Sequence, residues 1–472
     1  MKKLLICLLV IGTIGQLKAQ DITGSWQGQL NPSLSIIFNI TRTDTGYAAT
    51  FDVPAQKISG AVCSKAYMVK DSLFIEMAVL NGGYKGLWNG KGEVSGAYSQ
   101  NGAHIPLALK RITVGQKTAL NTDPVRAQTP KPPYNYFTQD VEYDNASKTL
   151  HYGATFTRPN GSGKYPAVII ISGSGTQDRN GSMMGHKPYW VLADYLTKQG
   201  IAVLRVDDRG AGKSSFGSNI NGATTLDFSY DVEASLNYLE SRPDVDKRHL
   251  GLIGHSEGGI IAPMVAARRK DVSFIVMWAG PAAGGGKTIA MQESLQLKKA
   301  GLDSVTVKAF TNLEESIFNL FATSANTDIL DQNITLVFDA WKKQQTPQIL
   351  SALNAHESTA LFPHYNGLYK SAWMRFLLSY DPEKDLSKVT CPVLAINGTK
   401  DTQVDANENL GAVKAILTKN GNKDFETIAL PGLNHLLQDA QTGDVSEYEK
   451  IPETLSPSAM NIISTWIKLH TK

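Results

Sequence analysis

The sequence has 472 residues, which exceeds one ordinary domain and indicates two or three. Apolar residues make up 42% of the chain and charged residues 19%, a balance typical of globular proteins with sizeable cores rather than of disordered or fibrous chains. The formal net charge is only +3, and no basic stripe with interleaved aromatic residues is present. The composition therefore argues against a nucleic-acid partner.

The first 19 residues have the pattern of a secretion signal. Lys2 and Lys3 precede an apolar run over residues 4–15, and the small residue Ala19 ends a plausible cleavage site. The apolar run is too short for a stable bilayer anchor. We therefore expect export to the periplasm or the extracellular space, without a stable membrane anchor.

Residues 20–113 are predicted to form a small all-β domain. Apolar and polar residues alternate over 34–41, which is the period of a half-buried strand. Asn-Gly pairs at 81–82, 89–90 and 101–102 are typical of hairpin turns. Such a domain could bind a ligand or a second subunit, or could simply pack against the rest of the chain. The linker predicted over 114–135 contains a proline-rich stretch that favours an extended, semi-rigid form.

From residue 136 to residue 472, strand and helix patterns alternate, which predicts a mostly parallel α/β sheet. An opening hairpin is expected at 140–159. The strands that follow are expected at 165–171, 201–206, 250–253, 274–278, 393–396 and 425–430, with a final helix at 457–469.

Residues 254–258 read Gly-His-Ser-Glu-Gly and carry the strongest functional signal. An apolar run precedes them and a helix-like run of small residues follows, over 259–267. Strand, tight turn and helix form the context of a nucleophile elbow, in which Ser256 projects from the sheet. Gly254 and Gly258 would allow the strand and the helix to approach closely. Without this context, the pattern would fit a simple Gly/Ser-rich turn equally well.

Two later strands supply partners for this serine. Asp401 follows the strand at 393–396, and His435 follows the strand at 425–430. We expect His435 to take the proton of Ser256 as general base, while Asp401 holds the imidazole tautomer. Asp405 is the alternative acid. His255 precedes the nucleophile and is expected to be a packed polar residue.

The loop at residues 172–175, Ser-Gly-Ser-Gly, follows a strand and is suited to an oxyanion hole. Such a site needs two backbone N–H donors. We assign one to Glu257, the residue after the nucleophile, and the other to Ser174, with its two neighbouring glycines as alternatives. Gln177 and Arg179 are candidate substrate-binding residues, although an internal salt bridge of Arg179 would explain it equally well.

Two Gly-Lys-Ser/Thr triplets, at 212–214 and 286–288, do not complete a phosphate-binding loop. The first glycine of that motif is replaced by Asp207 in one case and by Pro281 in the other. We expect no cofactor and no metal ion.

These motifs resemble those of α/β-hydrolase-fold serine hydrolases, over roughly residues 136–472. Residues 173–181 are similar to a segment of bacterial carboxylesterases that carry a β-rich domain before the hydrolase core, and residues 206–214 resemble the D-x-R-G-x-G-x-S loop of this superfamily. Ser172 departs from the pattern, since many relatives have a histidine there. The resemblance implies an α/β-hydrolase fold with a helical lid insertion at about 281–388, preceded by the all-β domain.

Within the predicted lid, aromatic and other large apolar residues are expected to line an acyl or leaving-group pocket, or to form the core of the lid itself. They are Phe310, Phe318, Phe321, Phe338, Trp341, Trp373, Met374 and Phe376.

The expected function is an exported serine hydrolase that cleaves small-molecule or glycan-linked acyl esters through an acyl-enzyme. One alternative is a serine aminopeptidase or acylaminoacyl-type peptidase, which would need a lid carboxylate such as Glu314, Glu315 or Glu357 to hold the substrate amine. Others are an acyltransferase, or a carbohydrate-binding or scaffold protein with a vestigial site. The oligomeric state stays open.

Overall fold

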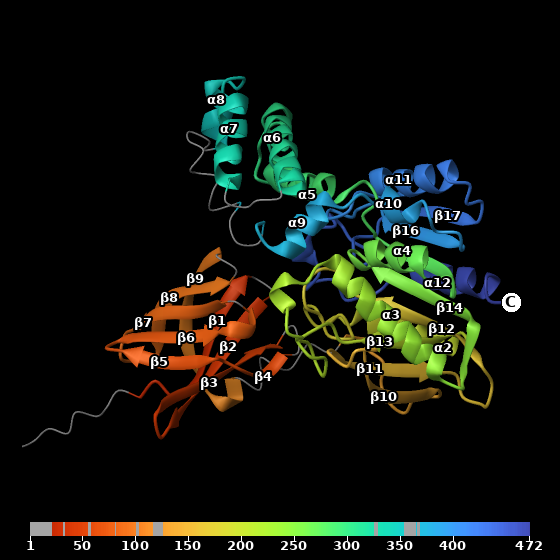
Figure 1. Ribbon diagram of the computed structural model, residues 1–472, viewed down its shortest axis with the longest axis horizontal. Helices are drawn as coiled ribbons and strands as arrows, with labels where there is room; N and C mark the ends of the chain where they lie inside the picture. The colour runs from red at the N-terminus through yellow and green to blue at the C-terminus, as the bar shows by residue number, and fades with distance from the viewer. Residues whose placement is uncertain are drawn as a thin grey trace, which may run out of the picture.

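The computed structural model describes residues 21–31, 34–54, 58–80, 82–100, 103–116, 126–324, 329–353, 365 and 369–472. The predicted secretion signal, Asn81, the Asn-Gly pair at 101–102 and Glu357 lie outside these residues. Figure 1 shows a β-rich part formed by residues 24–112, an α/β part, and a group of helices that stands above both.

The N-terminal part is a β-barrel. Its strands are β1 (Gly24–Asn31), β2 (Leu34–Thr43), β3 (Gly46–Val53), β4 (Ile58–Val62), β5 (Lys65–Val69), β6 (Ser72–Met77), β7 (Gly82–Trp88), β8 (Glu93–Gln100) and β9 (Ala103–Ile112), with a 3-10 helix η2 (Ala78–Leu80) between β6 and β7. The strand order is β2-β1-β9-β8-β7-β6-β5-β3, and β3 pairs back to β2, so the sheet closes on itself while β4 pairs with β3. Alternate side chains point inward, and Trp26, Phe38 and Phe51 fill the centre.

The α/β part contains an eight-stranded sheet in the order β10-β11-β13-β12-β14-β15-β16-β17, within the described residues. An antiparallel hairpin, β10 (Phe137–Asp144) and β11 (His151–Arg158), forms one edge, and all strands from β13 onward in this order are parallel. The parallel strands are β12 (Tyr165–Ile171), β13 (Ala202–Val206), β14 (Val245–His255), β15 (Val272–Trp278), β16 (Val393–Gly398) and β17 (Phe425–Leu430).

Helices cover both faces of this sheet, which explains why strands such as β12 and β15 are largely apolar and buried. On one face pack α3 (Thr225–Ser241), α4 (Gly258–Arg268) and α11 (Ala406–Lys419), and on the other α2 (Pro188–Lys198) and α12 (Pro457–Leu469). The predicted strands, the opening hairpin and the final helix are all present, and the predicted α/β-hydrolase fold class is confirmed.

The insertion after β15 is helical, as predicted. Its helices are α5 (Gly285–Lys299), α6 (Ser304–Thr323), α7 (Leu330–Lys342), α8 (Pro347–Ala352), α9 (Ala372–Ser379) and α10 (Glu383–Leu386). The helices α5 to α9 share an apolar core that rests on Ile260 and Met264 of α4, whereas Leu386 of α10 packs in the core beside the sheet. The insertion therefore lies over the carboxyl end of β14, where Ser256 is located (Figure 1).

The turn from β14 into α4 is unusually tight. A Cβ atom on Gly254 would lie 1.9 Å from the Gly258 carbonyl oxygen, and a Cβ on Gly258 would lie 2.5 Å from the Ile171 carbonyl oxygen of β12. Both distances are far below van der Waals contact, and both obstacles are backbone atoms that cannot rotate away. Glycine is therefore required at both positions by the packing of strand against helix.

Replacing Gly254 with alanine is expected to destabilise the protein by at least about 2 kcal/mol, because the backbone of α4 would have to move away from β14. Gly411 offers a matched control in the interior of α11, where a Cβ would meet no atom within 4 Å. Gly411→Ala should stabilise the helix by about 0.5–1 kcal/mol. Thermal unfolding of both variants checks this, and equal melting temperatures would contradict the close-approach argument.

Candidate active site

Ser256 occupies the strained turn between β14 and α4. Its φ is +53°, a left-handed conformation that non-glycine residues rarely adopt. The turn is held from both sides, since the Ser256 N–H donates to the Trp278 carbonyl at 2.9 Å and the Ser256 carbonyl accepts from the Gly259 N–H at 2.8 Å. Ser256 lines a cavity of about 300 Å³ together with His435. Backbone strain of this kind persists where the surrounding structure enforces it.

His435 is paired with Asp401 at a distance of 2.7 Å between Nδ1 and Oδ2, and both side chains are buried. The other carboxylate oxygen of Asp401 accepts from the N–H groups of Gln403 and Val404, at 2.8 and 2.9 Å. The carboxylate is thus fixed with one oxygen directed at the imidazole. Asp401 is thus the carboxylate that contacts His435, whereas Asp405, the alternative, caps α11 by accepting from the Glu408 N–H.

The loop that carries His435 is fixed by its main chain. The His435 carbonyl accepts from Trp278 Nε1 at 3.2 Å and lies 3.3 Å from His255 Nε2. His255 is itself buried, with Nδ1 2.9 Å from the Tyr189 hydroxyl. Burial, and then the neighbouring His435, hold the pKa of His255 well below its usual value. His255 is therefore a neutral packed residue that supports the site, as predicted.

The two residues predicted as oxyanion donors line the same cavity as Ser256. Among the described residues, no acceptor pairs with the backbone N–H of Glu257 or of Ser174. The alternatives are less suitable: the Gly173 N–H already donates to the Tyr189 hydroxyl at 3.2 Å, and Gly175 lines a different cavity. The geometry thus favours Ser174 within the loop.

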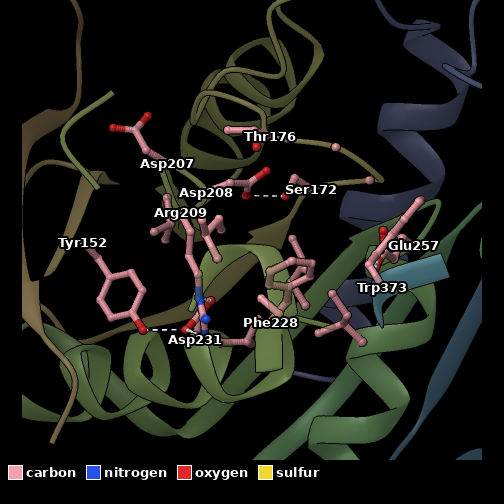
Figure 2. A pocket seen from close by; sticks show the side chains of 18 of the residues that line it. Tyr152, Ser172, Thr176, Asp207, Asp208, Arg209, Phe228, Asp231, Glu257 and Trp373 are labelled. Atoms are coloured by element: carbon pink, nitrogen blue, oxygen red, sulfur yellow. Dashed lines mark hydrogen bonds and ion pairs between the residues drawn. The ribbon is translucent and has the colours of Figure 1, made fainter. Parts of the chain in front are cut away.

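A partly buried carboxyl group, that of Asp208, holds this loop through two hydrogen bonds. Ser172 Oγ donates to Asp208 Oδ1 at 2.5 Å (Figure 2), and the Gln177 N–H donates to Asp208 Oδ2 at 2.8 Å. Ser172 therefore connects the loop to the neighbouring β13 loop, at the position where many relatives have a histidine. Burial raises the pKa of Asp208 to about 8.

The two candidate substrate-binding residues differ in their placement. Gln177 lines the catalytic cavity, and its side-chain amide lies 3.3 Å from the Ser174 carbonyl. Arg179 does not line that cavity. It forms an ion pair with Asp207, at 2.5 Å, and also donates to Thr155. The predicted substrate contact of Arg179 is therefore replaced by the alternative, an internal salt bridge that draws the side chain away from the site.

The lid reaches the site through α9, whose residues Trp373, Met374 and Leu377 line the catalytic cavity. Trp373 Nε1 donates to Glu257 Oε1 at 2.8 Å, and the same oxygen accepts from Thr225 Oγ1 at 2.7 Å. Burial raises the pKa of Glu257, while hydrogen bonds from Thr225, Trp373 and Ser174 oppose that rise. The Glu257 side chain thus connects the elbow, the oxyanion loop, α3 and the lid.

Most of the other large lid residues have a structural role. Phe318, Phe321, Phe338 and Trp341 are buried in the lid's own core. Glu314 is buried among them, and burial together with Glu293 raises its pKa to about 11. Neither Glu314 nor Glu315 is among the described residues that line the catalytic cavity.

Sequence reasoning did not assign roles to the side chains of Tyr189, Thr225 and Glu257. Tyr189 and Thr225 belong to no motif, because they act by position on neighbouring helices. Asp208 could have been found, since it lies within the D-x-R-G-like loop at residues 206–214.

No helix in the described ranges has the length and hydropathy needed to cross a membrane. No group of three or more His, Cys, Asp or Glu side chains in them is arranged to hold a metal ion.

A parallel sheet with this strand order, carrying a strained serine after β14 and an Asp–His pair after β16 and β17, defines an α/β-hydrolase. The sequence model of the family described as "Serine aminopeptidase, S33" matches residues 181–440. The chain belongs to this family.

The individual relatives named below are each less than 30% identical to this chain over the aligned residues. Esterase EstD of Thermotoga maritima is 26% identical over 285 residues, which are 60% of this chain and 57% of EstD. The chain thus matches little more than half the length of that relative. Acyl-coenzyme A thioesterase 1 of Mus musculus is 28% identical over 142 residues, or 30% of each chain. Among solved structures, the Pyrococcus furiosus esterase Pf2001 aligns with a TM-score of 0.43 at 17% identity, covering 74% of this chain and 98% of that one.

The raised pKa of Asp208 predicts how its replacement affects stability with pH. The folded state raises the pKa of Asp208 from 3.8 to about 8, so ionisation of this carboxyl group lowers the free energy of unfolding. This loss of stability is absent at low pH, grows as the pH rises and is complete above about pH 8. Asp208→Asn keeps the shape of the group without the charge. Its melting temperature relative to the parent should therefore rise between about pH 4 and pH 8 and level off above. A difference that is independent of pH would contradict the prediction.

Proposed function

We propose that the protein is an exported serine hydrolase that cleaves carboxylic esters through an acyl-enzyme. Ser256 is the nucleophile, His435 the general base and Asp401 the residue that orients the histidine. The observation that carries the proposal is the 2.7 Å Asp401–His435 pair, which borders the same cavity as a serine held in a left-handed turn. Export rests on the N-terminal signal pattern.

The reaction follows from the placement of these groups. His435 Nε2 takes the proton of Ser256 as its Oγ attacks the ester carbonyl, and the oxyanion accepts hydrogen bonds from the N–H groups of Glu257 and Ser174. The imidazolium then protonates the leaving alcohol as the C–O bond breaks. Water, deprotonated by His435, attacks the acyl-enzyme and releases the acid and Ser256.

The lining of the catalytic cavity favours a neutral substrate over a peptide with a free amine. Among the described residues that line it, Glu257 supplies the one carboxylate, and this group accepts hydrogen bonds from Thr225, Trp373 and Ser174. A substrate ammonium group would have to displace these donors. The name of the relative EstD, an esterase, agrees with the proposal. Because the family is described as a serine aminopeptidase, aminopeptidase activity is the second candidate function.

Hydrolysis of p-nitrophenyl esters by residues 20–472 tests the proposal. Ser256→Ala should abolish both turnover and labelling by an organophosphonate, because it removes the hydroxyl that forms the acyl-enzyme in the proposed mechanism. Asp401→Asn should lower kcat by about 10⁴, because the imidazole tautomer is no longer fixed.

Asp405→Asn is the matched control for the acid, since Asp405 caps α11 without contacting His435, and its kcat should stay close to that of the parent. Phosphonate labelling of Ser256→Ala would refute the nucleophile. Turnover of aminoacyl amides without turnover of any ester would support a peptidase function instead of an esterase function.

A further inference from the structure

A second cavity of about 310 Å³ lies directly beside the catalytic one and is not used by the mechanism above (Figure 2). Its described lining includes none of Ser256, Asp401 and His435. Its walls are largely apolar and come from β12, β13, α3 and α4, with side chains Ile169, Ile171, Val206, Phe228, Val232 and Ile261. The volume falls at the lower end of the range for small-molecule sites, about 300–1,000 Å³.

The polar groups at the far end of this cavity already have partners. Arg209 binds Asp231 through two hydrogen bonds, at 2.7 and 2.8 Å, and the Tyr152 hydroxyl donates to Asp231 at 2.5 Å. Figure 2 shows these three side chains directed toward one another. A charged ligand group would have to break this cluster, so the cavity is suited to a neutral, predominantly apolar group.

The catalytic cavity and the second cavity meet at Gly173, Glu257 and Trp373, which line both. Glu257 also supplies an oxyanion N–H, so the meeting point lies where the substrate carbonyl must bind. His435 lines only the catalytic cavity. Because His435 must protonate the leaving alcohol, the alcohol has to lie in the catalytic cavity. The acyl group then extends from the carbonyl in the other direction, toward the second cavity.

The β-barrel contributes to the same cavity. Leu80, in η2, and Gln100, at the end of β8, both line it, next to Asn221 of the 3-10 helix η3 (Ile220–Gly222). The N-terminal domain therefore forms part of the wall at a distance from the catalytic residues. A wall in this position would limit the length of a chain that enters from the catalytic side.

We propose that this second cavity is the acyl-binding site, that it takes a neutral aliphatic or aromatic acyl group past Trp373, and that the N-terminal domain helps to set the length of that group. The inference rests on the proposed esterase function. It assigns the acyl group to the second cavity, whereas the alcohol occupies the space under the lid beside Ile289, Met374 and Leu377.

Cavity-filling variants test the assignment through the chain-length profile of p-nitrophenyl esters. Val232→Phe narrows the cavity from the core, and Leu80→Trp narrows it from the barrel. Both should lower kcat/KM for octanoyl and longer esters by about tenfold or more and leave acetyl ester turnover within about twofold of the parent. Leu87→Trp is the matched control, because Leu87 lies in the same barrel with 61% of its surface exposed and does not line the cavity.

A direct measurement uses the intact protein labelled at Ser256 with an octylphosphonate. A crystal structure of this adduct should show the octyl chain among Ile171, Phe228 and Val232. Three results would each overturn the assignment of the acyl site while leaving the proposed esterase function intact. They are an octyl chain that lies under the lid, a chain-length profile that is unchanged in both filling variants, and an equal loss of kcat/KM with all esters. A parent protein without serine-dependent ester turnover would overturn the proposed function itself.

Discussion

The close approach of β14 and α4 is the constraint on which the rest of the site depends. The carbonyl of Gly258 lies where a side chain at Gly254 would be, so the chain must reverse direction within a few residues. This forces Ser256 into a positive φ and exposes its hydroxyl above the sheet. The same turn places the Glu257 N–H beside the nucleophile, because the residue that follows begins the first turn of α4. The proposed nucleophile and the proposed oxyanion donor are therefore positioned by one packing contact.

Polar groups in the interior position the His435 loop and the oxyanion loop relative to this turn. The Trp278 side chain and His255 contact the main chain of the His435 loop, while Tyr189 joins His255 to Gly173 in the oxyanion loop. Asp208 binds that loop a second time through Ser172. Each buried group has hydrogen-bond partners, which low-dielectric surroundings require. These hydrogen bonds connect the histidine loop and the oxyanion loop to the elements on either side of the serine.

Glu257 links this rigid site to the lid. Its backbone belongs to the elbow, whereas its carboxylate accepts from Trp373 of α9 and from Thr225 of α3. The side chain also stands where the catalytic cavity meets the apolar cavity that the barrel helps to close. In the proposed mechanism, one residue therefore takes part in transition-state stabilisation, in the position of the lid and in the separation of the acyl space from the alcohol space.

The sequence by itself determined the fold class, the strand positions and the tight turn at Ser256, because those depend on local periodicity and on a short turn that glycines must form. It left Asp401 and Asp405 open, and it could not decide between two roles for Arg179. The tertiary structure decided both, since Asp401 reaches His435 while Arg179 is bound by Asp207. Contacts between residues far apart in the chain, such as Trp373 with Glu257 or Leu80 with the second cavity, leave no local pattern and arise only when the separate elements pack together.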